Sequence, residues 1–573
     1  MPAAMTNAEA TRRLTAPGCP FEMEEATIRG VSLRVWKNAR PDLRTILVES
    51  RAFGDRPYLV FEDEPPISYG EQYRRAARLA ERLVSRFAVA KGDRVAIAMR
   101  NWPEWITAFW AAAATGAIVV PLNAWWTGEE LHYGLENAEV SVLIADGERL
   151  ASLQPYLDDL PALRGLVATR HDGTLPPKAV DWQALLDTAP ADAELPDVAI
   201  APDDPATIFY TSGTTGRPKG ALGTHRNICT NPVSVAFTRA RAALRRGLSA
   251  EDAVRPSPPG ASIVPVPLFH VTGCHSALVT NTLAGNKMVL MHRWNAERAL
   301  ALVDREGVTA ISGVPAMIWQ LIESPDFSRY DLSKVVSVGY GGAPAAPELL
   351  QQCRKYFPQA LVRNGYGMTE TSSVAAMNWA DDFVAHPDSV GAPVAVCDYR
   401  IVGADGQDLG PGEIGELWMK GPNVIAGYWR NPEATAQAIT EGWIHSGDLA
   451  RKDEDDFVYI VDRAKDMVIR GGENVYCVEV EDALYSHPGV MDAAVVGIPH
   501  RVLGEEVAAM VQVKRESRVS EAELQAWVRE RLAGFKVPVS IVFDHEPLPR
   551  NANGKILKAE VRAIVQAAAT VAG

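Results

Sequence analysis

Apolar segments of strand length alternate with amphipathic segments of helical spacing along most of this 573-residue chain. Residues 71–87 carry an apolar stripe with the period of a helix, and the runs 95–99 and 118–122 have the length and residue types of buried strands. The alternation continues past residue 350. It predicts an α/β fold in which helices cover sheets.

The pattern changes near the C-terminus, where the expected elements become shorter. We expect helices near 478–486 and from 520, and strands near 491–498, 507–513 and 539–543. Ser520 and Glu523 have capping-box spacing at the start of the second helix. A chain of this length exceeds one ordinary core, and a charged segment at 461–466 offers a boundary. We predict a large N-terminal domain of layered sheets and helices, residues 1–462, and a small α+β C-terminal domain, residues 466–573.

Composition and charge exclude several classes of protein. The formal net charge of −14 argues against a general nucleic-acid or anionic-membrane binder, although it is compatible with a local cationic pocket. The six scattered cysteines favour a reduced protein without a structural zinc site. The first 14 residues lack the apolar core of a signal peptide, and the uncharged run 106–122 is short for a membrane span. We therefore expect a cytoplasmic protein with no integral membrane segment and no nucleic-acid partner, and a buried helix followed by a buried strand at 106–122.

The strongest local motif follows a strand-like run at 206–209 and reads Tyr-Thr-Ser-Gly-Thr-Thr-Gly-Arg-Pro-Lys-Gly over residues 210–220. Its glycines allow backbone N–H groups to approach a ligand, and its hydroxyls and lysine add donors and a cation, which suits a polyphosphate. It is neither a Walker A loop nor a dinucleotide fingerprint. A polar hairpin turn is the alternative, but a turn needs far fewer hydroxyls and glycines. The residues expected at the phosphates are Thr211, Ser212, Gly213, Thr214, Thr215, Gly216 and Lys219.

This loop resembles the signature loop of the adenylate-forming superfamily, which includes acyl-CoA synthetases, the adenylation domains of peptide synthetases and beetle luciferases. Further segments agree with that family in the same order: 339–344 (Gly-Tyr-Gly-Gly-Ala-Pro), 364–370 (Asn-Gly-Tyr-Gly-Met-Thr-Glu), 442–448 (Gly-Trp-Ile-His-Ser-Gly-Asp) with 461–463 (Val-Asp-Arg), and 549–555 (Pro-Arg-Asn-Ala-Asn-Gly-Lys). The likeness runs from about residue 40 to residue 565. It implies an enzyme that adenylates a carboxylic acid with ATP and Mg²⁺, releases pyrophosphate and passes the acyl group to a thiol.

The resemblance implies a role for each of these segments. Tyr366 would stack on adenine, Thr369 would contact the α-phosphate, and Glu370 would bind Mg²⁺ through its carboxylate. Asp448 and Arg463 would bind the ribose hydroxyls, with an ordinary surface ion pair as the alternative. The remaining residues that the resemblance places around the nucleotide are Gly342, Ala343, Pro344, Asn364, Gly365 and Gly367.

Lys555 is the expected catalytic lysine. Its ammonium group would lie between the carboxylate nucleophile and the α-phosphate, two anions that repel each other. A solvated lysine is the ordinary alternative in such a loop, and only the resemblance favours catalysis. In the family, the small domain then rotates as a mobile lid so that the thiol can enter, about a hinge that corresponds to residues 463–465 with Lys465 at its end. Gly471 and Gly472 would leave room for the pantetheine arm of CoA, or would simply form a tight turn.

The acid channel is expected at residues 267–275, after a strand-like run at 262–266. Amino-acid-activating relatives usually carry Asp directly after the Phe of this segment, whereas acyl-CoA synthetases commonly have His, as His270 here. His270 would gate the channel; a structural histidine is the alternative. Small and apolar neighbours predict a fatty acid of medium or long chain, or an aryl-alkyl acid. The expected acid-pocket residues are Val271, Thr272, Gly273, Gly313, Val314, Met317, Tyr340, Gly341 and Met368.

The expected acceptor is coenzyme A, because no carrier segment of the Gly-Gly-Asp-Ser type follows Lys555. Two alternatives stay open: an adenylating enzyme that loads a separate acyl carrier protein, and a non-catalytic nucleotide-binding regulator. A homodimer is compatible with the sequence. The basic stretch 239–246 would contact CoA phosphates or an acidic membrane or, as charged helices more commonly do, form a solvated helix face. Asp455-Asp456 stands where the family usually has Asp-Gly.

Overall fold

The computed structural model describes residues 5–211, 217–342, 347–471, 473–514, 517–551 and 554–572. Two large mixed sheets form most of the N-terminal part, each parallel in its middle and antiparallel at an edge. The first has the order β21 (Gly427–Tyr428), β11 (Lys219–Thr224), β10 (Pro205–Thr211), β6 (Ile118–Pro121), β5 (Arg94–Ala98), β7 (Val142–Asp146), β8 (Gly165–Thr169), β9 (Ala179–Asp181). The second has the order β18 (Ala392–Pro393), β17 (Ala376–Trp379), β16 (Leu361–Tyr366), β15 (Ser337–Gly341), β14 (Ala310–Gly313), β12 (Ala261–Val264), β13 (Lys287–Leu290), β3 (Pro57–Phe61), β4 (Ile67–Ser68).

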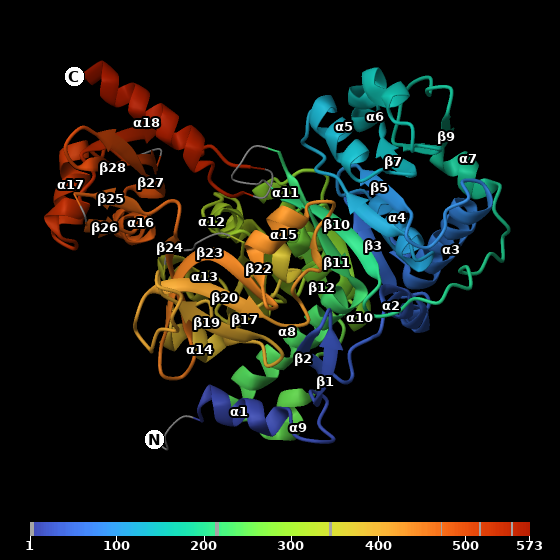
Figure 1. The fold of residues 1–573 in the computed structure, drawn as a ribbon, viewed down its shortest axis with the longest axis horizontal. Helices are drawn as coiled ribbons and strands as arrows, with labels where there is room; N and C mark the ends of the chain where they lie inside the picture. The colour runs from blue at the N-terminus through green and yellow to red at the C-terminus, as the bar shows by residue number, and fades with distance from the viewer. Residues whose placement is uncertain are drawn as a thin grey trace.

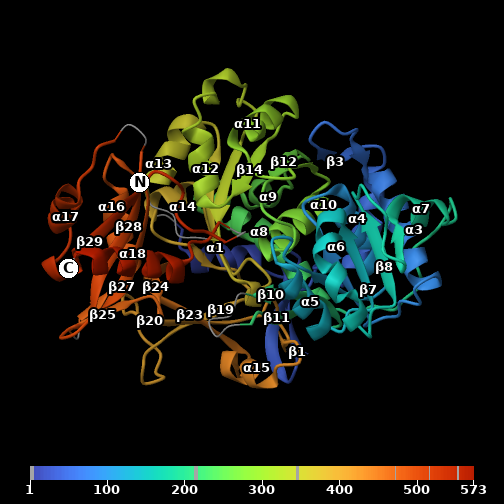
Figure 2. The ribbon, with the colours of Figure 1, turned by 90° about the horizontal axis from the view of Figure 1, so that it is seen from above.

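Two smaller sheets follow along the chain. A separate short hairpin, β1 (Met23–Ile28) with β2 (Val31–Trp36), precedes the large sheets in the sequence. The third sheet contains β19 (Asp398–Val402), β20 (Gly415–Lys420), β22 (Ile439–Thr440), β23 (Trp443–Lys452) and β24 (Val458–Arg463). The fourth contains β25 (Val468–Arg470), β26 (Glu473–Val475), β27 (Val490–His500), β28 (Gly504–Val513) and β29 (Ser540–Asp544). The views place this last sheet at one end of the molecule and β5, β7 and β8 at the other (Figures 1 and 2).

Helices cover the large sheets, and the main core lies between them. The N-terminal helices are α1 (Asn7–Leu14), α2 (Leu43–Ser50), α3 (Tyr69–Ser85), α4 (Pro103–Ala114), α5 (Gly128–Asn137), α6 (Gly147–Leu153), α7 (Trp182–Asp187), α8 (His225–Arg245) and α9 (Ala250–Val254). They are followed by α10 (Thr280–Ala284), α11 (Ala296–Arg305), α12 (Pro315–Ile322), α13 (Pro347–Tyr356), α14 (Ala380–Ala385) and α15 (Pro432–Ala438). The largest buried cluster combines α4 with β5 of the first sheet and β3 of the second.

The uncharged run 106–122 is a buried helix followed by a buried strand, as expected. Trp105, Phe109 and Trp110 of α4 are fully buried, and β6 follows after a short turn. Their burial between two sheets supplies the apolar environment that the sequence pattern requires. Within the residues that the structure describes, none of the helices combines the length and apolarity needed to span a bilayer.

The C-terminal elements have hydrophobic clusters of their own, drawn only from residues 468–565. Here α16 (Cys477–Tyr485) and α18 (Lys558–Ala572) pack on the fourth sheet, and α17 (Glu521–Arg529) packs on α16. The capping box is confirmed, because the Ser520 hydroxyl accepts from the Glu523 N–H and the Glu523 carboxylate accepts from the Ser520 N–H. The domain boundaries at 462 and 466 and the hinge at 463–465 stay predictions.

The solvated-face interpretation of the stretch 239–246 is wrong for two of its arginines. Arg241 is buried, and its guanidinium donates to the carbonyls of Ala392 and Pro393. Arg245 pairs with Asp382 and with Oδ2 of Asp455. The other carboxylate oxygen of Asp455, Oδ1, accepts from the Asn7 N–H of α1. A buried guanidinium needs such partners, so these residues tie α8 to distant segments.

The departure at Asp455-Asp456 has a conformational basis. Asp456 adopts φ +61°, in the left-handed region that glycine enters without strain and Asp tolerates better than most residues. The turn therefore keeps the conformation that favours glycine at this position, while the preceding Asp455 carboxylate is used to hold α1 and α8.

Candidate active site

A cavity of about 1800 Å³ opens where the two large sheets, the third sheet and the C-terminal segment meet. The carboxyl ends of the parallel strands β14, β15 and β16 face it, which is where open α/β sheets usually bind ligands. Most of the predicted site residues that the structure describes line this cavity. These are Thr211, Lys219, His270, Val271, Thr272, Gly313, Tyr340, Gly341, Gly342, Gly365, Tyr366, Gly367, Met368, Thr369, Glu370, Arg463, Lys465 and Lys555.

Other predicted residues lie elsewhere. Asn364, Asp448, Gly273, Val314, Met317 and Gly471 do not line the cavity. Ser212, Gly213, Thr214, Thr215, Gly216, Ala343, Pro344 and Gly472 lie outside the described residues. Gly273 serves packing, because a Cβ there would lie 2.1 Å from the carbonyl oxygen of Pro267. Met317 packs behind Gly313: a Cβ added at Gly313 would lie 3.3 Å from the sulfur of Met317.

Asp448 lies behind the cavity wall but is bonded to two residues that line it. The register of β23 and β24 places Asp448 opposite Arg463, and the Arg463 Nε lies 2.7 Å from Oδ1. The Tyr366 hydroxyl donates to Oδ2 across 2.6 Å. Burial and the carboxylate raise the pKa of Tyr366, so the hydroxyl keeps its proton. Asp448 is only 4% exposed, so this pair differs from the weak ion pairs of open surfaces.

Glu370 has a buried carboxylate that contacts Tyr428, a neighbour of Lys219. It lies in a short 3₁₀ turn, Thr369–Thr371, and its Oε1 accepts from the Tyr428 hydroxyl at 2.7 Å. The Lys219 Nζ lies 5.3 Å from the centroid of the same tyrosine ring. Among the described residues, no group of three or more His, Cys, Asp or Glu side chains could hold a metal. One carboxylate fits Mg²⁺ nonetheless, because this ion usually takes its other ligands from phosphates and water.

Lys555 enters the cavity from the loop between β29 and α18. The loop is closed by the Asn551 N–H, which donates to the Lys555 carbonyl at 2.9 Å. Gly554 has φ +75°, and a Cβ there would lie 2.8 Å from Cγ2 of Val314, so a glycine lets the loop press against the start of α12. The protein atoms that surround the Lys555 side chain, followed by the positive charge of Arg463, lower the pKa of Lys555 to about 8. The residue is nonetheless exposed to the open cavity.

His270 is the neighbour of this lysine on the acid side. Burial, followed by the charge of Lys555, lowers the pKa of His270 to about 4, so the ring is neutral at physiological pH. The Thr272 N–H donates to Nδ1 at 3.3 Å, which assigns the ring hydrogen to Nε2. His270 can therefore donate a hydrogen bond from Nε2 without bringing a second positive charge to Lys555.

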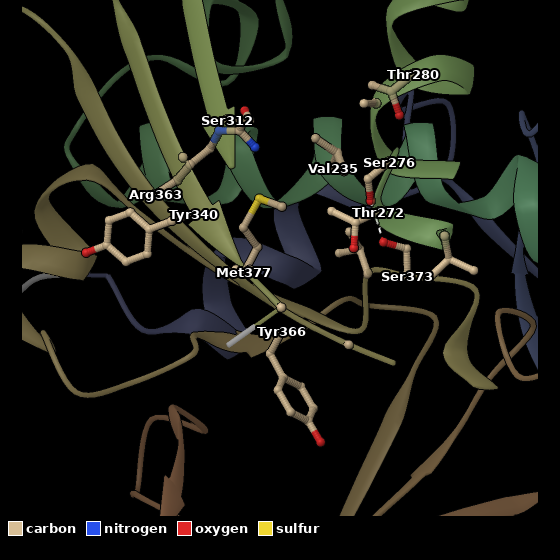
Figure 3. Close-up of a pocket in the computed structure, with 18 of the residues that line it drawn as sticks. Val235, Thr272, Ser276, Thr280, Ser312, Tyr340, Arg363, Tyr366, Ser373 and Met377 are labelled. Carbon is tan, nitrogen blue, oxygen red and sulfur yellow. Dashed lines mark hydrogen bonds between the residues drawn. The ribbon is translucent and has the colours of Figure 1, made fainter. Parts of the chain in front are cut away.

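The side of the cavity next to His270, where the acid is expected, has two different walls (Figure 3). One wall carries Thr272, Ser276 and Thr280 along a π-helix, Thr272–Val279, that continues into α10. The other wall carries Ser312, Tyr340 and Arg363 from β14, β15 and β16. The π-helix was not expected from the sequence. Ser276, Thr280, Ser312 and Arg363 were also missed; for Arg363, a charge inside the apolar run that precedes the Asn364 motif was the available signal.

Comparisons with known proteins agree with this geometry. A sequence model of the family described as AMP-binding enzyme matches residues 48–429, and one described as AMP-binding enzyme C-terminal domain matches residues 479–555. A feruloyl-CoA synthase from Amycolatopsis sp is 37% identical over 497 residues, covering 87% of this chain and 93% of its own. A 2-succinylbenzoate–CoA ligase from Geobacillus kaustophilus is 37% identical over 506 residues, with the same coverage.

The fold has a close counterpart among solved structures. An anthranilate CoA ligase in complex with anthranoyl-AMP superposes with a TM-score of 0.82 at 25% identity, covering 92% of this chain and 98% of its own. Matched domains, whole-length relatives and fold all point to the same chemistry. The chain belongs to the AMP-binding enzyme family and is an AMP-forming acid–thiol ligase that uses ATP, Mg²⁺ and CoA.

Proposed function

We propose that this ligase activates an aryl or aryl-alkyl carboxylic acid rather than a long alkyl acid. The lining of the acid side supports this most directly. Gly341 and Gly365 stand opposite each other on β15 and β16, and a Cβ on Gly341 would lie 2.5 Å from the Gly365 carbonyl oxygen. Strands without side chains at this point present a flat surface to a planar ring.

Hydroxyl groups on both walls further favour an aryl acid. Thr272, Ser276, Thr280 and Ser312 line the space that a long alkyl chain would have to cross. Covering these groups with methylenes would remove water without replacing its hydrogen bonds, which costs free energy. A ring with polar substituents can satisfy them. The feruloyl-CoA synthase and the anthranilate CoA ligase, both named for aryl acids, support the same choice.

We assign the nucleotide to the side of the cavity formed by β10, β11, β16 and β23. Tyr366, with Gly342, Gly365 and Gly367 around it, would take the adenine, while Asp448 and Arg463 would take the ribose. Thr211, Lys219 and Thr369 would bind phosphate oxygens, and Glu370 would hold Mg²⁺, which neutralises phosphate charge when bound. Asn364, which is off the cavity, would hold the strand, and the roles assigned to 212–216, Ala343 and Pro344 stay predictions.

In the first half-reaction, a carboxylate oxygen of the acid attacks the α-phosphorus as the bond to pyrophosphate breaks. The Lys555 ammonium group can contact both the carboxylate and the α-phosphate, which reduces their repulsion and stabilises the charge that builds up between them. Neutral His270 can donate from Nε2 to the second carboxylate oxygen and hold the acid in line. Val271, Met368 and Tyr340 would complete the acid site.

In the second half-reaction, the thiol of CoA attacks the acyl carbon and AMP leaves. We propose that the C-terminal domain rotates about Lys465, which withdraws Lys555 and brings Gly471 and Gly472 to the cavity. Lys465 lines the cavity, and the Asp466 and Met467 N–H groups both donate to the Arg463 carbonyl in a tight turn around it. Gly471 has φ +60°, so a side chain there would be strained.

Pyrophosphate release with a panel of free acids, with and without CoA, tests the proposal. Benzoate, 3-phenylpropanoate and 4-hydroxycinnamate are compared with unbranched alkanoates from butanoate to hexadecanoate. We expect kcat/KM for at least one aryl acid to exceed that of every alkanoate, and thioester to form on CoA. A preference for dodecanoate or hexadecanoate would overturn the aryl assignment, and thioester only on an acyl carrier protein would overturn the acceptor.

A further inference from the structure

Arg363 is a cation in the acid side of the cavity that no step of the proposed reaction uses. It lies on β16 and lines the cavity together with Ser312 and Ser337. Its Nη2 donates to the Ser312 hydroxyl at 2.7 Å, and its Nε reaches the Ser337 hydroxyl at 3.5 Å. The guanidinium also lies 5.2 Å from the ring centroid of Trp379.

Three neighbouring strands are shaped around this side chain. Ser312, Gly339 and Arg363 stand in register on β14, β15 and β16. A Cβ on Gly339 would lie 2.8 Å from Cζ of Arg363, so the guanidinium occupies the space above a glycine. The arginine is therefore held across the sheet, with its head group at Ser312 rather than extended into solvent.

The charge of Arg363 lacks an anionic partner within the described part of the chain. Its hydrogen bonds go to neutral hydroxyls, and no carboxylate of the described residues lies within ion-pair distance. Burial lowers the pKa of Arg363 to about 10, with no charged neighbour contributing. Arg363 is half-buried, whereas the more deeply buried guanidinium groups of Arg241 and Arg245 have carbonyl or carboxylate partners.

We propose that Arg363, with Ser312, binds a second carboxylate on the acid substrate, at the end remote from the carboxylate that reacts. This inference rests on the proposed function and narrows its substrate class to aryl dicarboxylic acids. A guanidinium has five N–H donors in a planar fork, and the contacts to Ser312 and Ser337 leave the Nη1 donors for a carboxylate. The neutral Ser312 hydroxyl can turn to donate to the same anion.

The position of Arg363 fits the remote carboxylate rather than the reacting one. The close-up shows Arg363 and Ser312 together on one wall, and the Tyr366 ring extending away from them (Figure 3). Lys555, which marks the reacting carboxylate, comes from the loop before α18 and has Arg463, Asp448 and Lys465 as charged neighbours. Lys555 at the reacting carboxylate and Arg363 at the remote carboxylate would thus hold a diacid in one orientation.

Paired substrates test the inference. Pyrophosphate release is measured with 1,4-phenylenediacetic and 1,4-phenylenedipropionic acids and with their monomethyl esters, which keep the ring but have one free carboxylate. We expect the wild type to prefer one diacid over its monoester by about tenfold or more in kcat/KM. Arg363→Met should lower kcat/KM for that diacid by about 10–100-fold and leave the monoester nearly unchanged. Arg363→Lys should be intermediate, because it keeps the charge but not the fork.

The stability of the ligand-free enzyme separates a binding role from a structural one. Removing a half-buried charge that has no ion-pair partner should leave the Tm of Arg363→Met unchanged or raise it, whereas loss of a structural arginine would lower it. Arg354→Met, which removes the same charge from an exposed position on α13, is the matched control and should leave selectivity and Tm unchanged.

The outcomes distinguish this inference from the function on which it rests. A wild type that releases pyrophosphate with aryl monoacids but shows no preference for either diacid would overturn the role of Arg363 alone. An Arg363→Met variant with a lowered Tm, or with equal losses on diacid and monoester, would do the same. Failure of every aryl acid, mono or diacid, would instead overturn the proposed function.

Discussion

The hydroxyl of Tyr366 donates to Oδ2 of Asp448 across 2.6 Å. The contact joins the end of β16 to β23, strands of two different sheets, and so connects the proposed adenine and ribose positions. Because Arg463 holds the other oxygen of Asp448, the carboxylate is fixed before a nucleotide arrives. Such preorganisation reduces the ordering cost of binding.

Tyr366→Phe removes this contact and keeps the aromatic ring. We expect KM for ATP in pyrophosphate release to rise about tenfold, the effect of losing one hydrogen bond to a charged group, while kcat stays nearly unchanged. Tyr366→Ala also removes the ring and should raise KM further. A Tyr366→Phe variant that lowered kcat without changing KM would contradict a binding role.

Lys555→Ala tests the separation of the two half-reactions. Adenylation should fall by at least about 10²–10³-fold, as when one transition-state charge contact is lost. Thioester formation from a supplied acyl-adenylate should be affected far less, because the proposed rotation withdraws the lysine before that step. Pyrophosphate exchange and thioester production are measured on the same preparation. Equal losses in both half-reactions would argue against the two positions of the C-terminal domain.

The pKa of Lys555 predicts the alkaline limb of the pH profile. Because its pKa is lowered to about 8, the ammonium group is lost as pH rises through that value, and kcat/KM for adenylation should fall above it. The corresponding fall in kcat should occur at a higher pH than the fall in kcat/KM, because bound ATP favours the charged form of the lysine. His270, with its pKa lowered to about 4, stays neutral throughout this range and cannot produce the limb.

Lys555→Arg provides the control for that limb. A guanidinium keeps its proton across the accessible range, so the residual adenylation of this variant should not decline between pH 7 and pH 9. Initial rates are corrected for protein stability at each pH. If the variant shows the same alkaline limb as the wild type, another group is responsible for it.

A proline at Lys465 tests the hinge. Proline fixes φ, so Lys465→Pro should impede rotation of the C-terminal domain and block thioester formation while sparing pyrophosphate release without CoA. Gly472→Trp, which would fill the expected pantetheine path, should give the same pattern. Lys465→Ala is the matched control and should retain both activities. Loss of adenylation in the proline variant would show that the position is not a hinge or that the fold is damaged.

Local patterns predicted the framework well, because each depends on neighbours in sequence. The stripe at 71–87 is α3, the runs at 95–99 and 118–122 are β5 and β6, and the Ser520–Glu523 capping box starts α17. Most motif residues also line one cavity, since motifs at the ends of adjacent parallel strands meet at one sheet edge.

Features that depend on long-range packing were not predictable. Arg241 was expected in a solvated stretch, yet its partners are carbonyls 151 and 152 positions away. Arg363 was passed over because its importance depends on what lies across β14 and β15. The prediction of an acid pocket near His270 also did not include Ser312 and Arg363, which line the opposite wall of the same cavity.

The charges of the proposed acid site predict that amino acids are poor substrates. His270 stands where amino-acid-activating relatives have Asp, its ring is neutral, and Lys555 and Arg363 are the nearby cations. Burying an ammonium group there without a partner costs several kcal/mol, whereas an apolar acid gains about 0.8 kcal/mol for each methylene it buries. We therefore expect kcat/KM for 3-phenylpropanoate to exceed that for phenylalanine by orders of magnitude, measured as pyrophosphate release. His270→Asp should rescue phenylalanine only in part, because Lys555, at the reacting carboxylate, still repels the ammonium group. If phenylalanine competes equally with 3-phenylpropanoate in the wild type, the acid site cannot be the one assigned here.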